Sequence, residues 1–194
     1  MTEEVKQQSD YEKLRSMTSL IANKEIRVFV EKFFDEQVPE YFKHVPASSS
    51  GKYHPAYALG EGGLCRHVIA TVKFIVHITS LEYLRIDSIM RDKMIAAAML
   101  HDAFKQGLDG SGQHTVKDHA RVASQQITKY ASELTELDPD RPTISRMVAT
   151  HMGQWEPKCK PGNRYEFLVH LADYLASRKD ILIDFDVPTS VRRD

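Results

Sequence analysis

Four histidines and two aspartates are the residues whose types and spacing point most directly to chemistry. Imidazole and carboxylate groups together suit a divalent metal ion. A divalent ion polarises a phosphoryl oxygen and lowers the pKa of bound water. The six residues occur in the order H, HD, H, H, D, each on or beside an apolar run: His67, His101, Asp102, His119, His151 and Asp173. The pattern therefore indicates a metal-bound site that cleaves phosphate compounds.

The adjacent pair His101-Asp102 is the most informative part of this pattern. It ends the apolar run from Met94 to Leu100, where a buried helix would otherwise continue with apolar residues. A buried ionisable pair costs several kcal/mol unless it is paired or bound to metal. His151 follows apolar residues at helical spacing, and Asp173 lies inside an apolar segment, so both also need a partner. One such histidine alone is usually a hydrogen-bonded core residue, but the ordered set favours a site.

The ligand types leave the metal open between Mn, Fe, Ni, Zn and Mg. Cys65 and Cys159 form no Cys-x-x-Cys pair and are expected to be reduced thiols outside the site. Because the carboxylate of Asp102 has two oxygens, it can bridge two ions. One ion would then be held by His67, His101, Asp102 and Asp173, and a second by His119, His151 and the shared Asp102.

The composition suits one soluble globular domain. The chain has 194 residues, of which 42% are hydrophobic and 27% are charged, and its formal net charge is −1. This length supports a sizeable core and leaves no room for a large appended domain. Residues 1–10 lack the apolar segment of a signal peptide, and no run reaches the roughly 18 apolar residues of a membrane span. We therefore expect a cytoplasmic protein that does not bind membranes. The near-neutral charge disfavours broad binding to nucleic-acid backbones without excluding a local basic groove.

Apolar spacing predicts helices throughout and no strands, so the expected fold class is all-α. The expected helices are one broken helix or two within 11–41, followed by 64–81, 91–101, 116–130, 143–152 and 165–179. A loop rich in Pro, Ser and Gly runs from about His44 to Gly63. A loop of this length in a compact domain is usually functional or disordered.

From about Gly62 to Lys179 the sequence resembles the HD-domain metal-dependent phosphohydrolases. The similar motifs are Gly63-Leu64-Cys65-Arg66-His67, Met99-Leu100-His101-Asp102-Ala103-Phe104-Lys105, Asp118-His119-Ala120, Thr150-His151-Met152-Gly153 and Leu171-Ala172-Asp173-Tyr174-Leu175. The resemblance implies a compact helical bundle with metal ions in its centre and hydrolysis of a phosphate ester or anhydride. His119 and His151 are similar to the additional histidines of the family's two-metal branch. That branch includes hydrolases of dinucleoside polyphosphates and cyclic dinucleotides, and some nucleases.

The expected organisation is one HD-type domain over residues 1–194. Its core covers about 62–180, and a helical N-terminal extension with a loop covers 1–61. The segment from Pro46 to Leu64 also resembles the lead-in of HD-domain exonucleases. The nucleic-acid-binding barrel that accompanies the HD domain in those enzymes has no room here, so nuclease activity is not transferred.

Candidate substrate contacts follow from residue type and position. Lys105, one turn after His101-Asp102, is the best candidate for stabilising a phosphate during catalysis, together with Asp102. Arg178 is a weaker candidate because, five residues after Asp173, it does not share the face of that aspartate closely. Three residues of the long loop are placed to close over the substrate: Lys52, Tyr53 and His54.

Other conspicuous residues are assigned to structure rather than to the site. His44, His77, His114 and His170 match no motif position. Trp155 follows His151 closely and is placed to line the pocket, although a lone tryptophan in a loop is more often a packing anchor.

The favoured function is hydrolysis of a phosphoester or phosphoanhydride bond in a small nucleotide or dinucleotide by metal-activated water. Two alternatives stay open: a nuclease acting on single-stranded ends, which needs a basic channel lined by aromatic residues, and a non-catalytic nucleotide-binding regulator. The complete ligand set speaks against the regulator. The sequence does not distinguish a monomer from a homo-oligomer.

Overall fold

The computed structural model describes residues 8–48, 51–52, 54–110, 114–131 and 143–190, and every regular element in these ranges is a helix. The α-helices are α1 (Asp10–Ser16), α2 (Lys24–Glu36), α3 (Gly63–Thr79), α4 (Ser88–Leu100), α5 (His119–Ala131), α6 (Ile144–Thr150) and α7 (Arg164–Ala176). The shorter 3-10 helices are η1 (Met17–Leu20), η2 (Glu40–Lys43), η3 (Ala56–Ala58), η4 (Glu82–Leu84) and η5 (Gly153–Trp155). The predicted all-α class is therefore confirmed.

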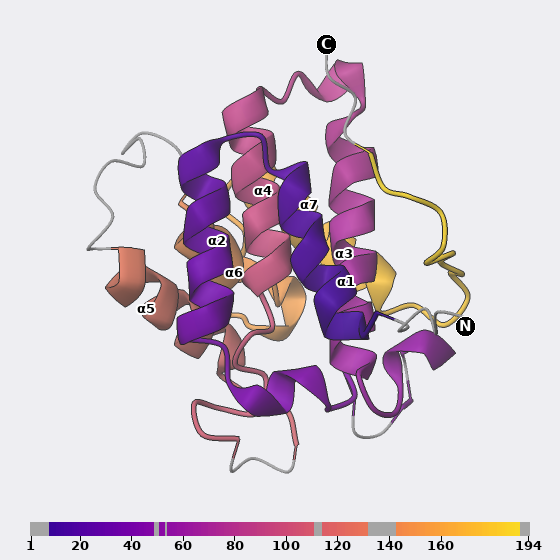
Figure 1. The fold of residues 1–194 in the computed structure, drawn as a ribbon. Helices are drawn as coiled ribbons and strands as arrows, with labels where there is room; N and C mark the ends of the chain where they lie inside the picture. The colour runs from indigo at the N-terminus through magenta and orange to yellow at the C-terminus, as the bar shows by residue number, and fades with distance from the viewer. Residues whose placement is uncertain (1–7, 49–50, 53, 111–113, 132–142, 191–194) are drawn as a thin grey trace, which may run out of the picture.

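Helix α4 forms the centre of the bundle. Its second half, Ile95 to Leu100, is completely buried. The helix packs against α2, α3, α6 and α7, and Figure 1 shows it with α2 and α3 on either side. A helix that is apolar all round is stable only inside a core. The residues that follow it, His101 and Asp102, are consequently carried into the middle of the molecule.

Aromatic residues of α2 fill the space between that helix and its neighbours. The ring of Phe33 meets the rings of Phe104 and Tyr130 edge-on, with centroids 6.2 and 5.5 Å apart. Phe29 lies 6.0 Å from the same tyrosine, measured between ring centroids. These contacts join α2 in the N-terminal extension to α5 and to the segment after α4, so the extension shares the core of the bundle.

Side-chain caps start several helices where the sequence offers a short polar residue. Ser9 and Glu12 form a capping box at α1, and the side chain of Asn163 accepts hydrogen bonds from two backbone N–H groups of α7. Asp87 accepts from the backbone N–H of Met90 and starts α4 at Ser88. The cap explains why α4 begins three residues before the predicted start at residue 91.

Two further predicted boundaries were wrong in ways that affect the site. Helix α5 begins at His119 rather than at residue 116, so this histidine lies at the end of the helix and not inside it. Helix α7 ends at Ala176 rather than at residue 179, with Ser177 as its C-cap. Because the chain turns away there, helical phase does not govern the position of Arg178.

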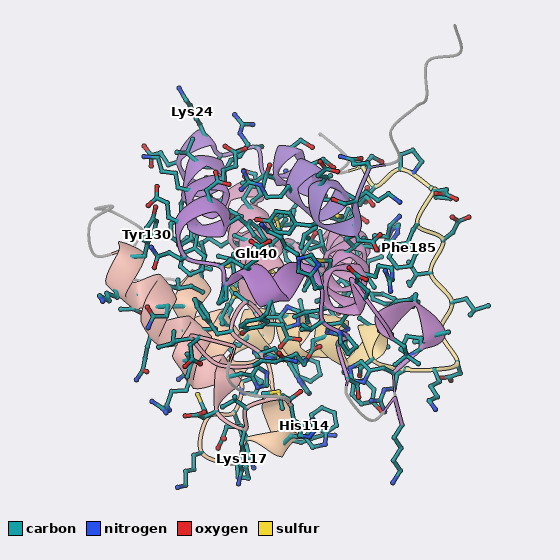
Figure 2. All side chains as sticks on the ribbon, turned by 60° about the horizontal axis from the view of Figure 1, so that its bottom comes forward. Lys24, Glu40, His114, Lys117, Tyr130 and Phe185 are labelled. Atoms are coloured by element: carbon teal, nitrogen blue, oxygen red, sulfur yellow. The ribbon has the colours of Figure 1, made fainter. Side chains whose placement is uncertain are left out.

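The segment after α7 returns along α3. The buried ammonium group of Lys73 donates to the carbonyl oxygens of Asp184 and Val187, at 3.0 and 2.6 Å. Phe185 packs edge-on against Tyr57, with ring centroids 5.1 Å apart. Figure 2 shows Phe185 on the flank of the molecule opposite Tyr130. Within the described residues, no helix combines the length and the apolar character that a membrane crossing requires.

Candidate metal centre

Five helix ends bring the six predicted ligands together; we call these residues the candidate centre. His67 is the fifth residue of α3, and His119 is the first residue of α5. His101 and His151 follow the last residues of α4 and α6, and Asp173 lies in the last turn of α7. Three helix C-termini therefore point at one place, and the partial negative charge of a helix C-terminus favours a cation.

The first group of ligand atoms surrounds His67. Its Nε2 lies 3.0 Å from Oδ1 of Asp173 and 3.3 Å from Nε2 of His101. Oδ2 of Asp102 lies 3.7 Å from the same nitrogen and 3.5 Å from Nε2 of His101. Ligand atoms of His67, His101 and Asp173 all lie within 4.8 Å of one another, which suits one metal ion.

The second group surrounds the other oxygen of Asp102. Oδ1 lies 3.1 Å from Nε2 of His119 and 3.6 Å from Nε2 of His151. The two Nε2 atoms of these histidines are 3.3 Å apart. Asp102 therefore directs one oxygen at each group, as expected for a carboxylate that bridges two ions. Its Oδ2 also accepts a hydrogen bond from Nζ of Lys105.

The backbone orients three of the imidazole rings. Each donates from Nδ1 to the carbonyl oxygen three residues earlier, at 2.7–2.8 Å: His101 to Ala98, His119 to Val116 and His151 to Val148. This assignment of the ring protons leaves a lone pair on Nε2, and it is the arrangement typical of histidines that bind metal.

The facing Nε2 atoms are the clearest sign that the residues fit a divalent ion. Two nitrogen lone pairs at 3.3 Å repel each other, so a proton or a cation has to lie between them. Oδ1 of Asp102 is also buried and has no hydrogen-bond partner within the described part of the chain, although it is close to His119. A cation would satisfy the facing nitrogens and this oxygen together.

The electrostatics of the candidate centre also favour a cation. Burial alone would raise the pKa of Asp102, but the charges of Lys105 and His101 hold it well below its usual range. Burial also opposes ionisation of Asp173, and hydrogen bonds with His101 and His67 keep its pKa well below the usual range. Burial lowers the pKa of His101, yet the two carboxylates outweigh this effect and raise that pKa to about 10. Both carboxylates are thus ionised, and a proton on His101 takes the place that a metal ion would occupy.

A cavity of about 470 Å³ opens onto the candidate centre. Asp173, with 15% of its side chain exposed, and His119 form part of its wall. Three of the predicted substrate contacts also line it: His54, Lys105 and Arg178. Lys52 is exposed at the surface and is not among the lining residues. Tyr53 lies outside the described residues.

His54, in the long loop before α3, lies beside the candidate centre. Its ring centroid is 5.5 Å from that of His67. Burial and the neighbouring His67 and Lys105 lower the pKa of His54 to about 4, so the ring is neutral near pH 7. A neutral imidazole at the cavity wall can exchange hydrogen bonds with a ligand without adding charge.

Two residues that the sequence assigned to structure also belong to this region. Trp155 lines the cavity and is 48% exposed, so the expectation of a packing anchor was wrong in part. His170 is buried and donates from Nδ1 to the carbonyl oxygen of His151 at 2.7 Å, which fixes the end of α6. A side chain at Gly153 would lie 2.3 Å from the His170 ring. The sequence could have placed His170 near the candidate centre, because it lies three residues before Asp173 and therefore on the same face of a helix.

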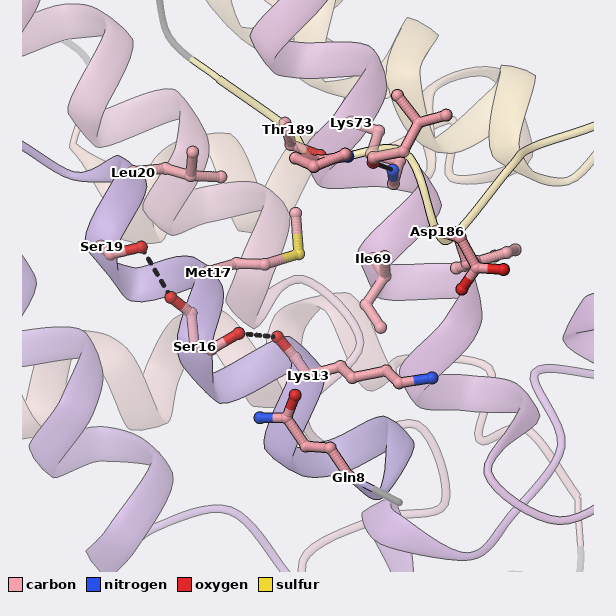
Figure 3. A pocket seen from close by; sticks show the side chains of 13 residues that line it. Gln8, Lys13, Ser16, Met17, Ser19, Leu20, Ile69, Lys73, Asp186 and Thr189 are labelled. Carbon is pink, nitrogen blue, oxygen red and sulfur yellow. Dashed lines mark hydrogen bonds between the residues drawn. The ribbon is translucent and has the colours of Figure 1, made fainter. Parts of the chain in front are cut away.

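A second cavity, of about 340 Å³, lies between α1, η1, α3 and the C-terminal segment (Figure 3). No residue of the candidate centre lines it. Its serine hydroxyls donate to backbone carbonyls, Ser16 to that of Lys13 and Ser19 to that of Ser16. Nζ of Lys73 donates hydrogen bonds to two backbone carbonyls of the C-terminal segment. Ser16, Ser19 and Lys73 are thus used to hold the fold together.

The comparisons with known proteins agree with this geometry. A family model described as HD domain matches residues 64–178, more than half of the chain and all six residues of the candidate centre. No curated protein and no solved structure matches the chain.

Proposed function

The chain belongs to the HD-domain family, and from this premise we propose that it is a metal-dependent phosphohydrolase. The proposed substrate is a small nucleotide or dinucleotide, cleaved at a phosphoester or phosphoanhydride bond. The proposed cofactor is one or two divalent ions, of Mn, Fe, Ni, Zn or Mg. The proposed ligands are the six residues of the candidate centre.

One observation carries this proposal: Asp102 directs its two oxygens at two different groups of imidazole nitrogens. Oδ2 faces His67 and His101, at 3.7 and 3.5 Å, and Oδ1 faces His119 and His151, at 3.1 and 3.6 Å. A structural ion pair needs one such contact, and the side chain here makes four. The arrangement is the one that a carboxylate shared between two ions requires.

The protein groups around the candidate centre have distinct tasks. Divalent ions bound there would supply Lewis-acid activation of a phosphoryl group and of water. Lys105 keeps Asp102 ionised and lines the cavity, so its ammonium group can stabilise negative charge on a phosphate beside that aspartate. Asp173 faces the cavity, which gives a ligand access to the candidate centre.

The direct test is an assay of the purified protein loaded with Mn²⁺ on a panel of phosphate compounds. The panel contains nucleoside mono- and triphosphates, dinucleotides and short single strands. Asp102→Ala removes the shared ligand, and Asp180→Ala, an exposed aspartate outside the candidate centre, is the matched control. We expect cleavage of one class of small molecule by the wild type and the control, and its loss in Asp102→Ala.

Other outcomes lead to other functions. Shortening of the single strands alone would identify a nuclease. Metal bound to the wild type without cleavage of any compound would contradict the phosphohydrolase and favour a nucleotide-binding regulator.

A further inference from the structure

One wall of the cavity takes no part in the candidate centre. It is formed by the segments that follow α6 and α7, and it includes Met152, Trp155, Ser177 and Arg178. The first segment follows His151, the C-cap of α6, and the second follows α7, which carries Asp173. This wall is therefore held at a fixed place beside the candidate centre, and none of its side chains is a proposed metal ligand.

The indole of Trp155 is exposed but firmly supported. Its ring is nearly parallel to that of Tyr174, with an interplanar angle of 19° and centroids 5.9 Å apart. The ring of His170 meets it edge-on at 5.9 Å, and His170 is itself tied to the backbone of His151. A large aromatic ring that stays 48% exposed at a cavity wall offers a flat apolar surface. Such a surface suits the stacking of another planar ring.

The guanidinium group of Arg178 lies beside this aromatic pair. It is 4.4 Å from the centroid of the Tyr174 ring, and its Nη2 donates to Oγ of Ser177 at 2.9 Å. Its Nε is buried without a hydrogen-bond partner, and no carboxylate of the described residues forms a salt bridge with it. Lys105, the other cation of the cavity, is already paired with Asp102. Arg178 is thus a cation with unused N–H groups, which suits a phosphate oxygen.

We propose that Trp155 and Arg178 recognise a nucleoside polyphosphate. The base stacks on the indole of Trp155, and Arg178 binds a phosphate other than the one that is cleaved. This inference rests on the proposed function for the position of the cleaved phosphate. It deepens that function because it requires a substrate with a planar base and more than one phosphate. A nucleoside monophosphate or an inorganic polyphosphate would lack one of the two contacts.

The chain provides its own reporter, because Trp155 is its one tryptophan. Intrinsic fluorescence is measured on the Mg²⁺-loaded protein during titration with hydrolysis-resistant analogues of the four common nucleoside triphosphates. We expect at least one analogue to quench the emission by stacking. Inorganic triphosphate, which has no ring, should leave the emission unchanged.

Variants of Arg178 test the second contact. Arg178→Ala should lower the affinity for the analogue that quenches the emission by roughly 10-fold or more, because the change removes a charged hydrogen bond. Lys179→Ala, which removes an exposed neighbouring cation outside the cavity, should keep the affinity within about twofold. Arg178→Lys retains the charge and should lie between them, which separates lost recognition from a folding defect.

The stacking surface is tested independently by steady-state kinetics. Trp155→Ala should raise KM for the nucleoside triphosphate that is cleaved, and Trp155→Phe should restore most of the affinity. Neither change should alter the binding affinity for inorganic triphosphate, measured by isothermal titration calorimetry, because this compound has no ring to stack.

Each remaining outcome overturns one of the two proposals. Absence of quenching by all four analogues, or quenching that Arg178→Ala does not weaken, overturns the recognition by Trp155 and Arg178. Quenching by single-stranded oligonucleotides alone overturns it too and indicates a nucleic acid instead. Hydrolysis without quenching would support the proposed phosphohydrolase and contradict recognition by Trp155 and Arg178. Quenching without hydrolysis of any compound would contradict the phosphohydrolase and support the recognition.

Discussion

At the scale of single residues, the candidate centre combines rings oriented by the backbone with two ionised carboxylates. The Nδ1 atoms of His101, His119 and His151 are committed to backbone carbonyls. Their Nε2 atoms are therefore directed at the middle of the site before any metal arrives. Such preorganisation reduces the cost of binding.

His101 gives the metal affinity a defined pH dependence. Because its pKa is raised to about 10, the metal-free protein holds a proton on this ring at pH 7, and binding has to displace it. The apparent affinity for Mn²⁺ should therefore rise roughly 10-fold per pH unit between about pH 6.5 and about pH 8.5. Isothermal titration calorimetry in buffers of different ionisation enthalpy measures the released proton. An affinity independent of pH, with no proton released, would show that metal binding displaces no proton from His101 and would contradict its raised pKa.

The sequence predicted this set of residues from their order and because each lies on or beside an apolar run. It undervalued Trp155 and His170, since an aromatic ring in a loop and a histidine on a helix have ordinary structural uses. Their positions depend on contacts between α6 and α7 that spacing along the chain does not show. Lys52 was proposed on its place in the loop, and the structure puts its side chain at the surface.

At the scale of elements, the start of α3 determines where His67 lies. Gly63 is the first residue of the helix, and a Cβ there would lie 2.4 Å from the carbonyl oxygen of Ala58. The turn before α3 is held by Arg66, which donates to the carbonyl oxygens of Tyr57 and Leu59. The first turn of α3 is therefore packed too closely to accept a methyl group.

Gly63→Ala tests this close approach. We expect a loss of about 2–3 kcal/mol in the free energy of unfolding, because backbone has to move to admit the methyl group. Gly60→Ala is the comparison: Gly60 has a positive φ, 68°, which Gly63 does not, and nothing lies within 4 Å of a Cβ there. Its cost should be about 1–2 kcal/mol, from backbone strain alone. Urea unfolding measures both, and a smaller loss for Gly63→Ala than for Gly60→Ala would refute the argument.

Helix existence was predictable from the apolar periodicity, and helix ends were less so. The predicted end of α7 at residue 179 placed Arg178 on a helical face turned away from Asp173. The helix ends at Ala176 instead, and the arginine lines the cavity. Nothing in the local sequence, Ser177-Arg178-Lys179, forbids another helical turn, so tertiary contacts decide this boundary.

At the scale of the whole molecule, the N-terminal extension supports the segment that follows the His101-Asp102 pair. The hydroxyl of Tyr41 donates to the carbonyl oxygen of Gly107 at 2.7 Å and accepts from the backbone N–H of Gln106 at 3.0 Å. Burial, opposed by the Gln106 hydrogen bond, raises the pKa of Tyr41 to about 12, so the hydroxyl keeps its proton. The extension thereby fixes the backbone four to five residues beyond Asp102.

Tyr41→Phe removes both hydrogen bonds and leaves their backbone partners unsatisfied. We expect a destabilisation of about 1–3 kcal/mol, with the larger value if water cannot reach the freed groups. The control is Tyr83→Phe, since Tyr83 is 94% exposed, and its effect should stay within about 0.5 kcal/mol. Thermal and urea unfolding compare the two variants. Equal free energies of unfolding for Tyr41→Phe and Tyr83→Phe would mean that the extension does not support this segment.

The central claim is that His67, His101, Asp102 and Asp173 bind one ion and that His119, His151 and the shared Asp102 bind a second. The most direct measurement is the metal content of the loaded protein, determined by elemental mass spectrometry. We predict about two ions per chain for the wild type and for His114→Ala, an exposed histidine, and about one for His151→Ala. An unchanged metal content in His151→Ala would contradict the account and return His151 to the role of a hydrogen-bonded core residue.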